Sequence, residues 1–578
     1  MVMMSHVSRF AFRASRFAPG DRLAVGAIVL AYVVGMVLMP PVRDFALLDD
    51  WVYTRLAEGV ASGQGLAPSQ YAQATLVSHV YWGAALMLLV GDTFTGLTLA
   101  TMALSLVGAL AFYGILRVLG FSAGLSGLGV AILTLNPFYL YLSYTFMTEV
   151  TFTALMLVAC LCYLLGGRGL QTVDGEHAKH ETRNAGEISS TDYRLPSTVY
   201  RLPSIAWLAV GGLFAALAFL TRQFGLALPM AALVWLVLAR RLTVGRALAV
   251  ALLPLLAAVG YYAWSSGFGP TFSGSVGREE LLELLNPAEW AQRGSRFLYF
   301  ALFLPGLTVP LWSRPRRWRI GLAVAIVMGV IAFVLWQVKL RLAREGQSSL
   351  DELSFTWLRP LFGDGLVITL VYSLGAALSA WLLFSMVERA WPAITGMVKH
   401  RVEALPALLF FLVGVILFAG TYLVSAGFLD RYWVPILPFV IAGALYGVKE
   451  RAFRSMLPAL IWLAVVGAYG AMLHLDDYAQ MDARWQSGRA LLARGVSVDK
   501  IENGYAWDGY FLGDVSMARY PDPDLKVIGR IFPPYEMIDP EYVIDSKPRQ
   551  GYRQIGSVQY FSILDGLRNR ELVVLMRE

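Results

Sequence analysis

The chain has 578 residues, of which 57% are hydrophobic and only 15% carry a charged side chain. Because soluble domains carry about 25% charged residues, this composition excludes a soluble globular protein and predicts a mainly α-helical, polytopic membrane protein. The formal net charge of +7 is concentrated in loops that we expect in the cytoplasm, so it reflects orientation and does not indicate nucleic-acid binding. The two cysteines, Cys160 and Cys162, lie inside one apolar segment and are expected to pack there.

The first apolar segment, 23–40, is long enough to span a membrane and lacks a small-residue cleavage site, so we expect an anchor and not a removed signal. A shorter apolar stretch, 76–91, contains His79 and a Tyr-Trp pair, and is expected to lie at or dip into the outer membrane surface. Segments of about twenty apolar residues recur along the chain. They predict about thirteen transmembrane helices, near 23–40, 97–116, 123–142, 150–165, 204–220, 224–239, 244–264, 295–312, 319–338, 366–386, 405–425, 433–448 and 456–474.

Lysine and arginine residues indicate the orientation, because cytoplasmic loops carry an excess of both. The basic N-terminus, 1–22, is expected in the cytoplasm, and alternation of the spans places five further basic loops on the same side. One basic loop, 339–347, falls on the outer side and disagrees. Within the transmembrane domain, 23–475, the polar stretch 166–203 is expected to be a flexible cytoplasmic insertion.

After the last predicted span the chain becomes polar, and 476–578 is expected to form a small extracytoplasmic α/β domain. A helix is expected over 474–495, and short strands over 541–546, 557–564 and 572–578. The aromatic stretch "NGYAWDGYF" could stack on sugar rings, but such spacing is more often found in a core.

Four separated segments place charged residues on the predicted outer membrane face. They are Asp49 and Asp50 after the first span, Glu149 in "TFMTEV", Arg222 in "FLTRQFG" and Arg431 in "GFLDRYWVP". A charge near hydrocarbon is costly and usually has a partner or a function. The convergence of these residues therefore predicts a functional site.

Each of these residues also has a simpler interpretation. The Asp pair fits a solvated loop or the N-cap of the next helix. Glu149 could favour the positive end of its helix, and Arg222 could extend from its apolar run to the interface. Arg431 could form a local ion pair with Asp430 at a helix start. Each interpretation is reasonable alone, but jointly they must all fall on the same side of the membrane.

Acids and arginines at the outer membrane surface fit sugar transfer from a lipid-linked phosphate. A carboxylate takes the proton of the acceptor hydroxyl, and arginines neutralise the departing phosphate. The sequence has no Gly-rich phosphate loop that would indicate a soluble nucleotide sugar. The alternatives are a membrane transporter or flippase, which usually places ionisable residues near the bilayer midplane on broken, repeat-related helices, and a non-catalytic envelope-assembly partner.

The motifs around these residues are similar to those of the GT-C glycosyltransferases of the aminoarabinose-transferase and protein-mannosyltransferase type, over residues 20 to about 475. In this resemblance Asp49 matches the acid regarded as catalytic, Asp50 stands where many relatives carry Glu, and Tyr53 matches a tyrosine. Glu149 matches a second acidic motif in which many relatives have Asp. Two further motifs match, a "TRQ" turn and an "RYxxPxxP" helix start, through Thr221, Arg222, Gln223, Arg431, Tyr432, Pro435 and Pro438.

The resemblance implies a GT-C-like fold and a polyprenyl-phosphate-linked sugar donor. The acceptor would be a lipid, a cell-envelope glycan or a protein at the outer face of the inner (plasma) membrane, with membrane lipids as further partners and no nucleic acid. The departures at Asp50 and Glu149 leave open whether a divalent metal is bound. The expected site residues are Asp49, Asp50 and Glu149 for catalysis, Arg222, Arg431 and Tyr432 for the donor phosphate, and Tyr53 and His79 for substrate positioning.

Overall fold

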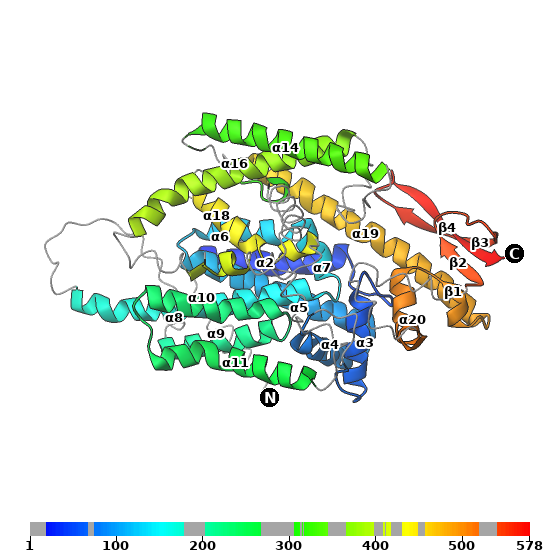
Figure 1. The fold of residues 1–578 in the computed structure, drawn as a ribbon, viewed down its shortest axis with the longest axis horizontal. Helices are drawn as coiled ribbons and strands as arrows, with labels where there is room; N and C mark the ends of the chain where they lie inside the picture. Colours follow the sequence, from blue (N-terminus) through cyan, green and yellow to red (C-terminus); the bar gives the residue numbers. More distant parts are fainter. Residues whose placement is uncertain are drawn as a thin grey trace.

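The chain is described from a computed structural model, which covers residues 19–67, 74–178, 203–266, 306–311, 315, 317–344, 366–397, 409–410, 412–417, 430–448, 457–519 and 540–578. Within these ranges the protein is mainly helical, with one four-stranded sheet near the C-terminus. Most of the long helices run along the long axis of the molecule, and the sheet lies at one end of it (Figure 1).

Helices of the bundle begin and end where the local sequence dictates. Asp92 caps α5 by accepting a hydrogen bond from the backbone N–H of Thr95. Asn136 and Pro137 break the predicted span 123–142 into two helices bent by 69°, because proline cannot donate the helical hydrogen bond. The described bundle elements are α2 (Pro19–Leu38), α3 (Asp50–Ala61), α4 (Val77–Val90), α5 (Thr93–Val118), α6 (Ala123–Thr134), α7 (Pro137–Ser143), α8 (Thr148–Ala178), α9 (Ser204–Phe219), η2 (Gln223–Leu226), α10 (Ala227–Leu238), α11 (Val244–Ser265), α14 (Trp318–Arg344), α16 (Leu366–Met397), η5 (Asp430–Trp433), α18 (Leu437–Val448) and α19 (Leu457–Ala493).

Six of the described helices are long and apolar enough to cross a membrane, and the bent pair α6–α7 makes a seventh if it is counted as one span. The prediction of a multi-pass helical membrane protein is therefore confirmed. Because the predicted spans 295–312 and 405–425 lie mostly outside the described residues, the total of about thirteen stays a prediction. The six helical spans are Pro19–Leu38, Thr93–Val118, Thr148–Gly167, Val244–Ser265, Thr369–Glu388 and Leu457–Ala493.

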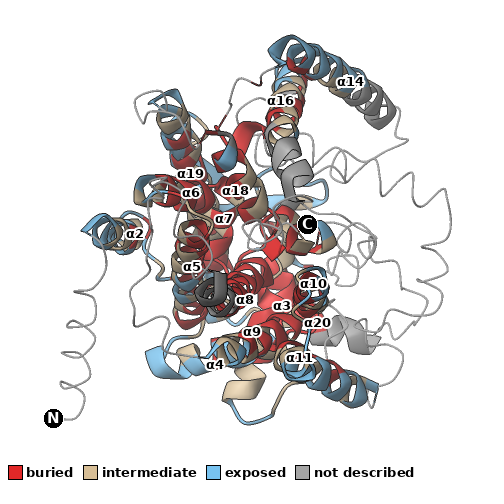
Figure 2. Cartoon of the chain, turned by 90° about the vertical axis from the view of Figure 1, so that its left-hand side faces the viewer, coloured by how far each residue is buried: buried red, intermediate tan, exposed pale blue. Residues whose placement is uncertain are grey.

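The core lies around α5 and α8, and apolar side chains point outward from the peripheral helices. In the apolar, membrane-spanning stretch of α8, 89% of the residues are buried, whereas in that of α2 only 6% are buried. The difference between the two helices is visible in Figure 2. Exposed leucine and valine side chains cover α2, α11 and α14. Such apolar surface is what a bilayer-facing helix requires. Cys160 and Cys162 are free and buried in α8, which confirms that they serve packing.

The C-terminal part continues directly from the bundle. The 37-residue helix α19 passes the predicted boundary at 475 without a break. It is followed by η7 (Val498–Lys500), β1 (Ile501–Glu502), α20 (Tyr505–Arg519), β2 (Tyr542–Asp545), β3 (Tyr552–Ser562) and β4 (Arg568–Arg577). The sheet order is β1-β2-β4-β3, in which β1 is parallel to β2 and the other neighbours are antiparallel. The three predicted strands are confirmed as β2, β3 and β4, and the last two begin earlier than expected.

The C-terminal segment packs against the bundle through its aromatic side chains. Trp485 of α19 and Trp507 of α20 belong to the main core, and Trp485 contacts Phe94 of α5 at a centroid distance of 5.7 Å. A second, small cluster lies under the sheet. Helices α3 and α20 and the sheet lie at the same end of the molecule, whereas α8 extends to the opposite end, where it reaches Ala178 within the predicted insertion (Figure 1). The rest of that insertion, 179–202, lies outside the described residues.

Candidate active site

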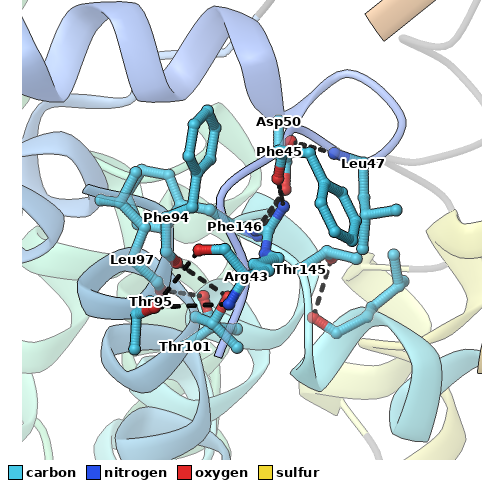
Figure 3. A network of polar contacts seen from close by, with 12 residues as sticks. Arg43, Phe45, Leu47, Asp50, Phe94, Thr95, Leu97, Thr101, Thr145 and Phe146 are labelled. Atoms are coloured by element: carbon cyan, nitrogen blue, oxygen red, sulfur yellow. Dashed lines mark hydrogen bonds and ion pairs between the residues drawn. The ribbon is translucent and has the colours of Figure 1, made fainter. Parts of the chain in front are cut away.

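Asp50 is fully buried and is held by three donors from two loops (Figure 3). Its Oδ2 accepts hydrogen bonds from Arg43 Nη2 at 2.6 Å and from the backbone N–H of Phe146 at 3.2 Å. Its Oδ1 accepts from the backbone N–H of Leu47 at 2.7 Å. Asp50 therefore ties the first loop to the loop before α8, and both of its carboxylate oxygens are engaged by the protein.

Arg43, which the sequence did not single out, fixes this first loop on α5. The guanidinium donates to Thr98 Oγ1 at 2.8 Å and to the carbonyl of Phe45 at 2.7 Å, in addition to Asp50. Leu48 follows Leu47 in the turn that leads to Asp49. It has a φ of 53°, a left-handed conformation that a leucine rarely adopts. The buried Arg43–Asp50 pair thus holds a strained turn immediately before Asp49.

Asp49 occupies the N-cap position of α3, but its side chain makes no capping hydrogen bond. Instead Oδ2 accepts from Arg431 Nη2 at 2.5 Å, and Oδ1 accepts from the hydroxyl of Tyr505 at 2.7 Å. The Asp49 side chain is 30% exposed, unlike Asp50 and Glu149, which are fully buried. The contacts of Asp49 reach across the chain to η5 and α20, so neither a helix cap nor a freely solvated loop describes it.

Glu149, in the first turn of α8, joins the two predicted arginines. Its Oε1 lies 2.8 Å from Arg222 Nη2 and 3.2 Å from Arg431 Nε, while Arg222 Nε donates to Thr148 Oγ1 at 2.8 Å. Glu149 Oε2 is buried, and none of the described residues donates a hydrogen bond to it. Arg431 bridges Asp49 and Glu149, which connects the predicted acids and arginines in the order Asp49, Arg431, Glu149, Arg222. Arg222 is buried in this chain of ion pairs.

Tyr432 lies beside both arginines. The Cζ of Arg222 lies 5.0 Å from the centre of the Tyr432 ring, and the Cζ of Arg431 lies 6.0 Å from it. These distances permit cation–π attraction. Tyr432 is thus placed with the two arginines, as the sequence predicts.

Tyr53 and His79 are buried beside the loop that precedes α8. His79 is fully buried, stacks on Phe146 at 4.0 Å, and its Nδ1 lies 3.0 Å from Thr151 Oγ1. Its other ring nitrogen, Nε2, lies 3.3 Å from the carbonyl of Phe146. The Tyr53 ring meets His79 edge-on at 5.7 Å. Both side chains therefore support the site from inside, and His79 has its ring nitrogens engaged by α8 and the loop before it.

The surroundings of Asp49 favour its ionised form. Burial alone would raise the pKa of this carboxyl, but the charge of Arg431 and the hydrogen bonds from Tyr505 and Arg431 outweigh it and hold the pKa below its ordinary value. Among the described residues, no three His, Cys, Asp or Glu side chains form a group that could hold a metal ion. The sequence leaves open whether Asp50 and Glu149 bind a metal. Within the described part of the chain, Glu149 Oε2 receives no hydrogen bond, whereas both carboxylate oxygens of Asp50 accept hydrogen bonds from the protein.

Comparisons with known proteins give structural similarities at low identity. No family model and no curated protein matches the chain. Among solved structures, ArnT from Cupriavidus metallidurans bound to undecaprenyl phosphate is 14% identical, with a TM-score of 0.41 over 82% of this chain and 72% of that one. The archaeal oligosaccharyltransferase AglB from Archaeoglobus fulgidus, in complex with an inhibitory peptide and a dolichol-phosphate, is 13% identical, with a TM-score of 0.41 over 82% and 58%. ArnT from the same organism in the apo state is 14% identical, with a TM-score of 0.38 over 95% of this chain and 96% of that one.

Proposed function

We propose that this protein is an integral membrane glycosyltransferase that moves a sugar from a polyprenyl-phosphate carrier to a hydroxyl group of a lipid, envelope glycan or protein. The observation that carries the proposal is the position of Asp49. This partly exposed carboxylate is held at the accessible end of a chain that continues through the partly buried Arg431 to the buried Glu149 and Arg222. General-base and phosphate-binding groups thereby lie side by side.

Asp49 is assigned as the general base. Of the three predicted acids it is the one whose side chain is partly exposed, and its environment favours the ionised form. In the transfer step, the acceptor oxygen forms a bond to the anomeric carbon of the donor sugar. The bond from that carbon to the phosphate oxygen breaks, and its electron pair leaves with the polyprenyl phosphate. The acceptor proton passes to Asp49.

Arg431 and Arg222 are assigned to the phosphate. The leaving polyprenyl phosphate gains negative charge, and guanidinium groups stabilise it through paired N–H donors. Without donor, these side chains are neutralised by Asp49 and Glu149. The buried carboxylate of Glu149 contacts both arginines, so we assign it to keeping them side by side.

Asp50 is assigned a positioning role in place of direct catalysis. A carboxylate that is fully buried and accepts three hydrogen bonds from the protein has no free access to an acceptor hydroxyl. Its contacts with Leu47 and Phe146 hold the loop before Asp49 against the loop that leads into α8 and Glu149. The two adjacent acids of "LLDD" thus have different tasks.

The site is placed on the outer face of the inner membrane. Asp49 directly precedes α3 and Tyr505 begins α20, and both helices lie at the same end of the molecule as the sheet (Figure 1). The basic segment 240–246, between α10 and the start of α11, supports a cytoplasmic location for the opposite end. The C-terminal segment would then be extracytoplasmic, with about thirteen helices in the membrane.

The test is transfer by the purified protein in proteoliposomes. The donor is a polyprenyl-phosphate sugar with labelled sugar, and the acceptor is an envelope extract from a strain that lacks the protein. We expect label in the acceptor and release of one polyprenyl phosphate for each sugar transferred. A flippase would move the intact donor between leaflets, and an assembly partner would leave it unchanged. Either result, with no polyprenyl phosphate released, would overturn the proposal.

A further inference from the structure

Helix α20 packs closely on α3 at the proposed site. Gly509 makes this approach possible, since a Cβ atom there would lie 2.3 Å from Cε2 of Trp51. One turn earlier, the Tyr505 ring meets Trp51 edge-on at a centroid distance of 6.2 Å. The two helices are therefore in direct contact although 456 residues separate Asp49 from Tyr505.

Two tyrosine hydroxyls of α20 donate at the same distance to carboxylates in and just before α3. Tyr505 donates to Asp49 Oδ1 at 2.7 Å, and Tyr510 donates to Glu58 Oε1 at 2.7 Å. The Asp49 and Glu58 side chains are similarly exposed, at 30% and 26%. The two pairs differ in their surroundings, because Asp49 also binds Arg431 of the proposed phosphate site.

We propose that Tyr505 is a positioning residue for the general base, so that α20 of the C-terminal segment is part of the active site. This inference rests on the proposed glycosyl transfer by Asp49. Arg431 binds Oδ2 and Tyr505 binds Oδ1, so both carboxylate oxygens are anchored and the group cannot rotate. The remaining lone pairs of the Asp49 carboxylate are then held in a fixed orientation, ready to take the proton of the acceptor hydroxyl.

The charged groups around Asp49 come from several elements. Arg431 of η5 attracts it, Tyr505 of α20 hydrogen-bonds to it, and Tyr53 of α3 interacts with it electrostatically. Glu149 of α8 lies on the other side of Arg431 and, through Arg222, has a second counter-charge. Of the two groups that donate a hydrogen bond to Asp49, Tyr505 is the one that can be removed without changing any formal charge.

The experiment compares Tyr505→Phe with Tyr510→Phe and wild type in the transfer assay, across pH and donor concentration. Loss of the Tyr505 hydroxyl removes a donor that favours ionised Asp49, so its pKa rises. We expect the acid limb of the kcat profile to move about one unit to higher pH. We expect kcat at neutral pH to fall while the donor KM changes little. Tyr510→Phe loses an equivalent hydrogen bond of the same helix, and should keep the wild-type profile.

A second variant, Gly509→Ala, adds a methyl group against Trp51 while it retains both hydroxyls. Either α20 or the Trp51 ring must shift to make room for it, which disturbs the contact that holds Tyr505 beside Asp49, and we expect an upward shift of the same kind in the acid limb. If wild type is active and Tyr505→Phe shows the profile of Tyr510→Phe, the inference about Tyr505 is wrong and the transfer function stands. If wild type transfers no sugar, the proposed function itself fails.

Discussion

Replacement of Asp50 by asparagine should destabilise the protein more than the same change at Asp49. The side chains of Arg43 and Asp50 are 1% and 0% exposed, so Asp50→Asn leaves a buried guanidinium without its counter-charge. Removing one partner of a buried ion pair costs about 3–5 kcal/mol. In addition, the new amide N–H₂ must face N–H donors, from Leu47 or from Phe146 and Arg43. Asp49 is partly exposed, and its replacement should cost less.

The assay is thermal unfolding of the purified variants in detergent, followed by tryptophan fluorescence. We expect a fall in Tm of several degrees for Asp50→Asn and a smaller fall for Asp49→Asn. A double-mutant cycle with Arg43→Met isolates the pair, because the double variant no longer contains an uncompensated buried charge. Its loss should be smaller than the sum of the single losses by roughly 1–3 kcal/mol. Additive losses, or an Asp50→Asn variant as stable as wild type but inactive, would refute the positioning role.

Three further predictions concern the phosphate site, the C-terminal segment and the topology. Arg222→Lys and Arg431→Lys should each raise the donor KM about tenfold or more while the protein stays folded, because lysine lacks paired donors; an unchanged donor KM in both would remove the phosphate assignment. Burial raises the pKa of Asp508 to about 8. Between about pH 4 and 8 this carboxyl is therefore protonated in the folded state and ionised in the unfolded state, so the free energy of unfolding should fall as pH rises through this range. Asp508→Asn should abolish this slope in Tm measured from pH 5 to 8.5, and a slope equal to that of wild type would contradict it. Because both native cysteines are buried, an impermeant maleimide applied to intact cells should label Ser546→Cys but not Leu242→Cys, and the reverse pattern would invert the topology.

Much of the fold was predictable because apolar length is a local signal. The spans at 97–116, 150–165 and 244–264 appear as α5, α8 and α11, and the strands near the C-terminus appear as β2 to β4. Length alone could not predict that α19 continues through 475 as one helix. Its polar half stays helical because side chains such as Trp485 pack in the main core, which is a tertiary effect.

The site was predictable in its residue types but not in its pairing. The sequence placed Asp49, Glu149, Arg222 and Arg431 on one side, and the structure joins them in one chain of ion pairs. It could not separate the task of Asp49 from that of its neighbour Asp50, because their difference depends on which loop each carboxylate faces.

Arg43 gave no local signal, and the aromatic run of Tyr505 indicated sugar stacking or a core but no contact with Asp49. Arg43 stands in an ordinary basic position after the first span, and its role depends on its contact with Thr98 of α5. Tyr505 belongs to an aromatic run that is typical of a core, and Trp507 in that run is indeed fully buried. Only the packing of α20 on α3 brings the Tyr505 hydroxyl to Asp49.

The most direct test of the account is the transfer activity of Asp49→Asn, measured in proteoliposomes at matched protein abundance with a polyprenyl-phosphate sugar as donor. Asparagine preserves the shape and a hydrogen-bond acceptor for Tyr505, but it cannot take the acceptor proton. The account predicts that kcat falls by roughly 10² or more, the range for a positioned general base. Activity within a few-fold of wild type would contradict the assignment of Asp49 and, with it, the proposed mechanism.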